Sequence, residues 1–137
     1  MSFVLDASIA VSWAFPDEEW GSSMKLLDKL ETEFAYVPSL WSLEVGNAVL
    51  MAERKKRITY ADVREFFSIL QNLNIKVDEQ TDLCAFHEIF TLAKTQGLTT
   101  YDAAYLELAM RMGLSLATRD QLLANAAKKL GVEVINQ

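Results

Sequence analysis

The stretch "LSLATRDQLLANAAKKLGVEVI", residues 114–135, decides the fold. An apolar run at 114–118 is typical of a buried strand, and residues 119–130 show the spacing of a helix that Gly131 closes. A second apolar run follows at 132–135. Because two strands joined through a helix commonly pair in parallel, this stretch predicts one strand–helix–strand unit of a parallel sheet.

The same alternation extends through the rest of the chain. Further strands are expected at 3–6, 35–38 and 75–77. Helical patterns occupy 7–15, 18–33, 39–57, 59–73, 81–96 and 100–112, and Thr59 is a candidate N-cap. Short apolar strands between helices indicate an α/β fold, a three-layer α/β/α sandwich with a central parallel sheet.

Composition narrows the class of protein. With 137 residues, 51% of them hydrophobic, and few Pro or Gly, the chain is expected to form one domain over 1–137. The uncharged stretches, such as Ala7–Pro16, are too short to cross a bilayer, and no signal peptide is evident, so a cytoplasmic protein is expected. The single cysteine and single histidine, Cys84 and His87, leave little scope for a zinc site. We interpret both as packing residues, with proton transfer by His87 as the alternative.

Polar residues follow two of the expected strands. Asp6 ends the first strand in "VLDAS", and Thr118 and Asp120 follow the fourth in "LATRD". Ligands of parallel sheets bind beyond the carboxyl ends of the strands, so these side chains are expected at one edge. Each of them is also a favoured helix cap, and the sequence leaves that alternative open.

Glu44 stands in the middle of a helix with a mostly apolar face. In "SLWSLEVGNAVLMAE" its neighbours one turn away include Leu40, Trp41 and Ala48. A carboxylate directed at a core is costly unless charge or metal compensates it, so Glu44 requires a partner. The alternative is that Glu44 lies at the edge of the apolar stripe. Asn47 is either a polar support for Glu44 or an ordinary helix residue.

Asp102 has two interpretations. In "LTTYDAAYLELAMRMG", residues 98–113, it follows Thr99 by three positions, as in an N-terminal capping box. Its own face continues with Tyr105 and Leu106, which favours a position near the interior. Taken together, Asp6, Glu44, Asp102 and Asp120 form a possible acid cluster. Such oxygen ligands suit Mg²⁺ or Mn²⁺, and a cation would offset their mutual repulsion.

At this point the sequence resembles the PIN-domain family, most closely the VapC-like ribonuclease toxins of toxin–antitoxin pairs. The resemblance rests on four motifs in family order: "VLDAS", "SLEVGNAV", "TTYDAAYLELA" and "LATRDQLL". It implies a PIN-like fold in which the four acids hold one or two Mg²⁺ or Mn²⁺ ions. It also places Ser8, Asn47 and Thr118 at the polar positions around them. Some PIN domains carry a further acid near the position of Thr118, so the second ion is left open.

The resemblance further implies an activity and partners. The activity is endoribonucleolytic hydrolysis of RNA phosphodiester bonds, leaving a 5′-phosphate and a 3′-hydroxyl, by the toxin of a type II pair. Asp6 and Asp102 are expected as direct metal ligands, and Glu44 as a ligand or as the residue that orients water. Asp120 is expected to act at a weaker site or through water. A homodimer and an antitoxin across the active-site groove are also implied.

Two other classes of protein remain possible. One is a non-catalytic PIN-like module that binds a partner. The other is a Mg²⁺-dependent phosphoryl-transfer domain. A phosphatase of the haloacid dehalogenase type would want an acid where Ser8 stands, and a receiver domain needs a lysine where Arg119 stands.

Charge and aromatic content concern the substrate and partners. A net charge of −6 predicts weak non-specific affinity for a polyanion. The basic run 54–57, with Arg54 and Lys55, is expected about 15 Å beyond Glu44 along one helix. It either contacts a substrate phosphate or offsets the helix dipole. Arg119 is the better candidate for a substrate phosphate, with pairing to an acid as the alternative. Six large aromatics are expected mostly in the core, with some at a partner surface: Trp13, Phe15, Trp20, Trp41, Phe66 and Phe67.

Overall fold

A computed structural model describes residues 2–15 and 21–135, and the fold is organised around a five-stranded parallel sheet. The strand order is β3-β2-β1-β4-β5, and every neighbouring pair is parallel. The strands are β1 (Phe3–Leu5), β2 (Ala35–Val37), β3 (Ile75–Val77), β4 (Ser115–Ala117) and β5 (Val134–Ile135). All the strands expected from the sequence are therefore confirmed.

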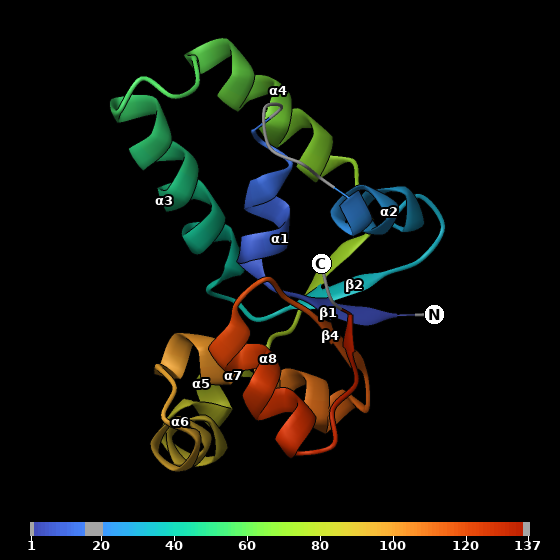
Figure 1. Ribbon diagram of the computed structural model, residues 1–137, viewed down its shortest axis with the longest axis vertical. Helices are drawn as coiled ribbons and strands as arrows, with labels where there is room; N and C mark the ends of the chain where they lie inside the picture. Colours follow the sequence, from blue (N-terminus) through green and yellow to red (C-terminus); the bar gives the residue numbers. More distant parts are fainter. Residues whose placement is uncertain (1, 16–20, 136–137) are drawn as a thin grey trace.

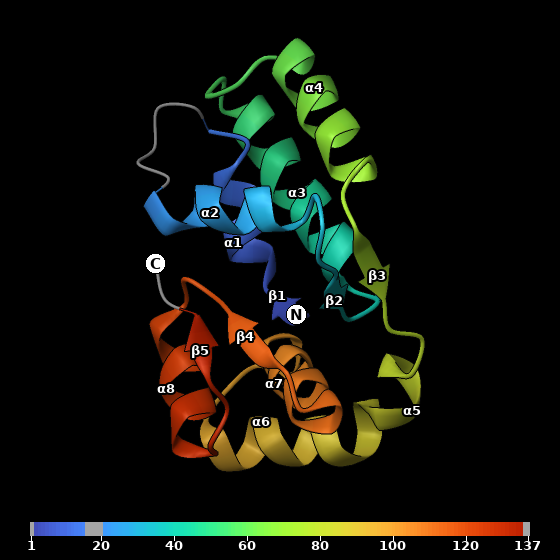
Figure 2. The same ribbon diagram turned by 90° about the vertical axis from the view of Figure 1, so that its right-hand side faces the viewer.

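Helices cover both faces of this sheet. Figures 1 and 2 show α1 to α4 on one side and α5 to α8 on the other, which confirms the three-layer α/β/α sandwich. The helices are α1 (Ala7–Ser12), α2 (Gly21–Lys29), α3 (Trp41–Arg54), α4 (Tyr60–Gln71), α5 (Thr81–Cys84), α6 (Phe90–Gln96), α7 (Thr100–Met112) and α8 (Gln121–Lys129), with a π-helical turn η1 (Ala85–Ile89). None of the helices in the described part of the chain is long and apolar enough to span a membrane.

The register of the central strands brings two loops together. Leu5 at the end of β1 pairs with Ala117 at the end of β4. The next residue, Asp6, donates its backbone N–H to the carbonyl of Ala117 over 3.0 Å. Asp6 and Thr118 therefore leave the sheet side by side, at the carboxyl edge where the sequence predicts a ligand site.

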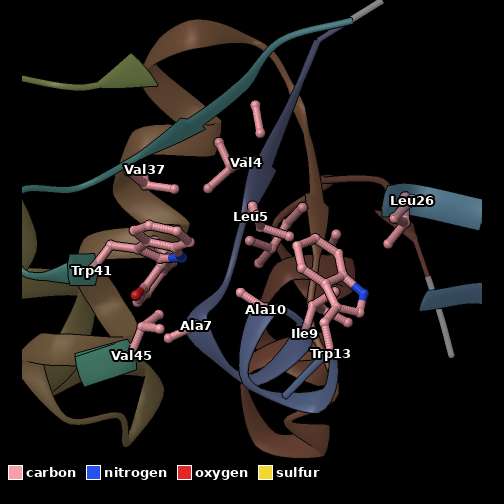
Figure 3. Packing of buried hydrophobic residues seen from close by; sticks show 14 of the residues in the cluster. Val4, Leu5, Ala7, Ile9, Ala10, Trp13, Leu26, Val37, Trp41 and Val45 are labelled. Carbon is pink, nitrogen blue, oxygen red and sulfur yellow. The ribbon is translucent and has the colours of Figure 1, made fainter. Parts of the chain in front are cut away.

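The core surrounds β1, whose three residues are all buried. Figure 3 shows Val4 and Leu5 packed among apolar side chains from α1, α2, α3 and β2. Of the large aromatics expected in the core, Phe67 is exposed and Trp20 lies outside the described residues, whereas four are buried: Trp13, Phe15, Trp41 and Phe66. Most of them are therefore core residues, as expected.

Several helix boundaries differ from the sequence-based expectation. α1 ends at Ser12, α3 ends at Arg54, and the pattern expected at 18–33 is a helix only over Gly21–Lys29, with 18–20 outside the described residues. The predicted N-cap is confirmed: Thr59 and Asp62 form both hydrogen bonds of a capping box at α4. Gly131 follows α8 with φ +82°, a left-handed conformation that glycine accommodates.

The interpretation of His87 as a packing residue is wrong. The helix expected over 81–96 contains the π-helical turn η1, which widens one turn and shifts the phase of the residues after it. Ile89 and Ala93 consequently face the core. Phe86 and His87 are exposed, and Cys84 is only partly buried.

Candidate active site

Asp6 is the most buried acid of the predicted cluster, with 5% of its surface exposed. Its Oδ2 accepts hydrogen bonds from the hydroxyls of Ser8, over 2.8 Å, and Thr118, over 2.6 Å. Burial raises the pKa of Asp6, and the nearby Asp120 raises it further, while the two hydroxyls lower it. The hydroxyls therefore offset part of the cost of holding an ionised carboxylate in the interior.

Each of the two hydroxyls also holds the loop that follows β4. Ser8 Oγ accepts the backbone N–H of Arg119 over 3.1 Å, and Thr118 Oγ1 accepts that of Asp120 over 3.0 Å. Each hydroxyl thus donates to Asp6 and accepts from the loop. This arrangement fixes the start of α8 against the end of β1.

Asp120 acts as a helix cap in this structure. It occupies the N-cap position of α8, and its Oδ1 accepts the backbone N–H of Leu123 over 3.1 Å. The capping alternative is therefore correct for Asp120. It does not exclude the other role, because Asp120 also interacts electrostatically with Asp6 and Asp102.

Glu44 is half-buried on α3, and its partner is Tyr105 on α7. The Tyr105 hydroxyl donates to Glu44 Oε1 over 2.5 Å. Burial raises the pKa of Glu44, the bond from Tyr105 lowers it, and the charges of Asp6 and Asp102 raise it. Burial and the Glu44 carboxylate raise the pKa of Tyr105 far above its usual value, so Tyr105 stays a hydrogen-bond donor.

Asp102 is half-buried in the first turn of α7, and Thr99 is the N-cap residue of that helix. The backbone N–H of Asp102 donates to Thr99 Oγ1 over 3.1 Å. Among its described residues, α7 lacks the reciprocal bond that completes the capping box of α4. Burial raises the pKa of Asp102, and the charges of Asp120 and Asp6 raise it further. The Thr99 hydroxyl also hydrogen-bonds to the Asp102 carboxylate and lowers its pKa, so Asp102 interacts both with its cap and with the other acids.

The four predicted acids form one electrostatically connected set. Asp6 interacts with each of the other three, and Asp102 interacts with both Glu44 and Asp120. Among the described residues, however, no group of three His, Cys, Asp or Glu side chains is arranged to hold a metal ion as it stands. The carboxylate and hydroxyl oxygens nevertheless fit a hard divalent cation by their chemistry.

An open cavity of about 400 Å³ lies beside Glu44. Its lining comes from α1, α3 and the loop after β4: Ala7, Ser8, Val11, Glu44, Ala48 and Arg119. Arg119 is exposed at this cavity, which suits a residue that contacts an anionic substrate.

The other predicted polar residues lie further out. Asn47 is exposed and is not part of the cavity lining. Arg54 and Lys55 are exposed at the C-terminal end of α3, which Figure 1 shows extending away from the sheet. That position, at the C-terminal end of the helix, suits interaction with the helix dipole.

Two features were not anticipated from the sequence. The first is the hydroxyl of Tyr105, whose only sequence signal is its place three residues after Asp102. The second is a network in which Arg111 donates to the buried Glu107 over 2.8 Å and to Asp78, after β3, over 2.7 Å. The four-residue spacing of Glu107 and Arg111 on one helix predicts the ion pair between these two residues but not the contact with Asp78.

Comparisons with known proteins agree over almost the whole chain. A family model described as "PIN domain" matches residues 3–129. Two relatives come from Pyrobaculum aerophilum. One, named Exonuclease VapC9, is 29% identical over 98% of this chain and 93% of its own. The other, named Ribonuclease VapC3, is 28% identical over 90% of this chain and 93% of its own.

Solved structures share the fold. The crystal structure of PAE2754 from Pyrobaculum aerophilum is 26% identical, with a TM-score of 0.73 over 99% of this chain and 89% of the other. A chain of VapBC2 from Rickettsia felis, solved bound to a DNA fragment from its promoter, has a TM-score of 0.68. That chain is 16% identical, over 100% of this chain and 99% of its own.

Proposed function

Because this chain belongs to the PIN-domain family, we propose that it is a metal-dependent endoribonuclease and the toxin of a type II toxin–antitoxin pair. The observation that carries the proposal is the connected acid set around Asp6 at the carboxyl edge of the sheet. Four acids brought together by the end of β1, by α3, by α7 and by the N-cap of α8 repel one another, which destabilises the fold unless they serve a function. A role in binding cations explains their presence.

The relatives support the choice of reaction. One carries the name Exonuclease and the other Ribonuclease, so hydrolysis of nucleic-acid phosphodiesters is common to both names. The open cavity beside Glu44 favours internal cleavage, because an internal segment of RNA can lie across it without an end being inserted. RNA is proposed as the substrate because the second relative is named a ribonuclease.

The metal proposed is Mg²⁺ or Mn²⁺, as one or two ions. Asp6 and Asp102 are the proposed direct ligands, Glu44 is a ligand or orients the attacking water, and Asp120 acts at a weaker site or through water. A bound divalent cation lowers the pKa of water towards neutrality and stabilises the leaving oxygen.

The remaining residues position these groups. Ser8 and Thr118 lower the pKa of Asp6 through their hydrogen bonds, and Ser8 fixes the loop that carries Arg119. Arg119 is proposed to hold the substrate phosphate at the cavity. Arg54 and Lys55 are weaker candidates, restricted to a phosphate about 15 Å further along the RNA. Asn47, one turn from Glu44 on α3, remains the proposed polar support for Glu44.

The proposed partners are a cognate antitoxin and a second copy of this chain. The shared fold with a VapBC2 chain supports the antitoxin. Exposed large apolar side chains, among them Leu83, Phe86 and Phe90, offer surface for protein partners. The cytoplasm is the proposed location for a protein that acts on RNA.

A calorimetric Mn²⁺ titration tests the proposal before any RNA is chosen. The variants are Glu44→Gln and Asp102→Asn, with Glu53→Gln as a matched control on the helix that carries Glu44. Circular dichroism verifies that all are folded. We expect the wild type and the control to bind Mn²⁺ and both site variants to bind at least tenfold more weakly. Binding that is absent, or equal in all four proteins, would leave the non-catalytic module as the better description.

A further inference from the structure

Tyr105 reaches the candidate active site from inside the core. Its side chain is fully buried, yet its hydroxyl donates to Glu44 Oε1 over 2.5 Å. The Tyr105 hydroxyl oxygen also accepts a hydrogen bond from the backbone N–H of Ala7, the residue after Asp6. A single hydroxyl on α7 therefore contacts both α3 and the start of α1.

Tyr105 and Asp102 are linked through their helix. They are three residues apart on α7 and so project from the same face. The helix supplies one acid of the site directly and holds a second acid, Glu44, through the Tyr105 hydroxyl. The separation between Asp102 and Glu44 is consequently set by a rigid element rather than by two independent side chains.

Glu44 needs such a restraint. Its side chain is long and half-exposed, and the charges of Asp6 and Asp102 repel it. In the described part of the chain, Tyr105 is the one group that donates a hydrogen bond to the Glu44 carboxylate. Without that bond, repulsion and hydration favour a Glu44 side chain that swings away from the site.

We propose that Tyr105 is a positioning residue, which holds Glu44 Oε1 and thereby presents the second carboxylate oxygen, Oε2, to the acid cluster. This inference rests on the proposed metal site. It assigns to a buried tyrosine a role that reaches the metal only through Glu44.

The test is Mn²⁺ affinity measured by calorimetry in Tyr105→Phe, which keeps the buried ring and removes the hydroxyl. Loss of a hydrogen bond to a charged group predicts binding about tenfold weaker than in the wild type. Tyr101→Phe makes the same chemical change on the same helix at a side chain that is 62% exposed. Leu108→Val perturbs the buried face of α7 without touching Glu44. We expect both controls to bind within twofold of the wild type.

The outcomes separate this inference from the proposed function. No Mn²⁺ binding by the wild type overturns both. Wild-type binding that Glu44→Gln weakens and Tyr105→Phe leaves within twofold overturns the role of Tyr105 alone. Equal losses in Leu108→Val and Tyr105→Phe also overturn it, because they trace the effect to packing of α7. If Tyr105 acts through Glu44, the double variant Glu44→Gln with Tyr105→Phe binds Mn²⁺ no more weakly than Glu44→Gln alone, and this result supports the proposal.

Discussion

Replacing Thr118 by valine tests how the buried Asp6 is held. Thr118 is 2% exposed, and its hydroxyl donates to Asp6 Oδ2 over 2.6 Å and accepts the backbone N–H of Asp120 over 3.0 Å. Valine has nearly the same shape but no hydroxyl. The substitution therefore removes two hydrogen bonds and leaves the packing volume almost unchanged.

The expected loss is about 2 kcal/mol of unfolding free energy. A hydrogen bond to a charged group contributes about 1.5–3 kcal/mol, and the Asp6 bond is short and buried. The bond to Asp120 adds little, because Asp120 is partly exposed and water replaces the lost partner. For a domain of this size, at about 3 °C for each kcal/mol, the melting temperature falls by about 6 °C.

The assay is urea unfolding followed by circular dichroism at pH 7.5 with EDTA, paired with a Mn²⁺ titration. Thr91→Val, at an exposed position of α6, is the control for replacing threonine by valine. We expect Thr118→Val to lose stability and to bind Mn²⁺ more weakly, since an unsupported Asp6 is harder to ionise. A variant with wild-type stability and wild-type affinity would refute the idea that Thr118 supports Asp6.

Three further predictions concern charge. The pKa values of Asp6, Glu44 and Asp102 are raised in the folded chain, so the folded state binds protons more tightly than the unfolded state. The stability that this protonation contributes is fully present below about pH 4 and is lost as pH rises through the folded pKa values. Urea midpoints at pH 5 and 7.5 in EDTA should show this loss, and saturating Mn²⁺ in place of EDTA should reduce it. Asp102→Asn should raise the metal-free midpoint at pH 7.5, because it removes one repelling charge, and an unchanged or lower midpoint contradicts this. Arg111→Met leaves Glu107 buried without its cation and should cost about 2 kcal/mol in the same urea assay, with equal stability as the refuting result.

The sequence predicts the strand ends well because two independent signals coincide there. In "VLDAS" an apolar strand is followed at once by an acid, so both the element and the polar residue after it are visible. The parallel sheet then requires that Asp6 and Thr118 meet at one edge, and the register between Leu5 and Ala117 does bring them together. Short-range patterns combined with one topological rule were sufficient for this part of the site.

Features that depend on contacts distant in the sequence were not predictable in the same way. Tyr105 lies in an apolar stripe and looks like an ordinary core residue, because its partner Glu44 is 61 positions away. The π-helical turn that exposes His87 leaves the apolar spacing of 81–96 close to that of a regular helix. In both cases the local pattern is compatible with the structure but does not determine which side chain faces which neighbour.

A helix-cap position and the proposed active-site role, which the sequence presents as alternatives for Asp102 and Asp120, are compatible in this fold. Glu44 and Asp102 lie in the first turns of α3 and α7, and Asp120 is the N-cap of α8. The N-terminal end of a helix carries partial positive charge, which stabilises a nearby carboxylate. Several helices begin beside the carboxyl edge of a parallel sheet. Their N-terminal ends both favour acidic residues and stabilise the negative charge of those residues, so several acids can lie close together there. The N-cap or first turn of a helix is thus a favourable place in this fold for an acid of the proposed cation site.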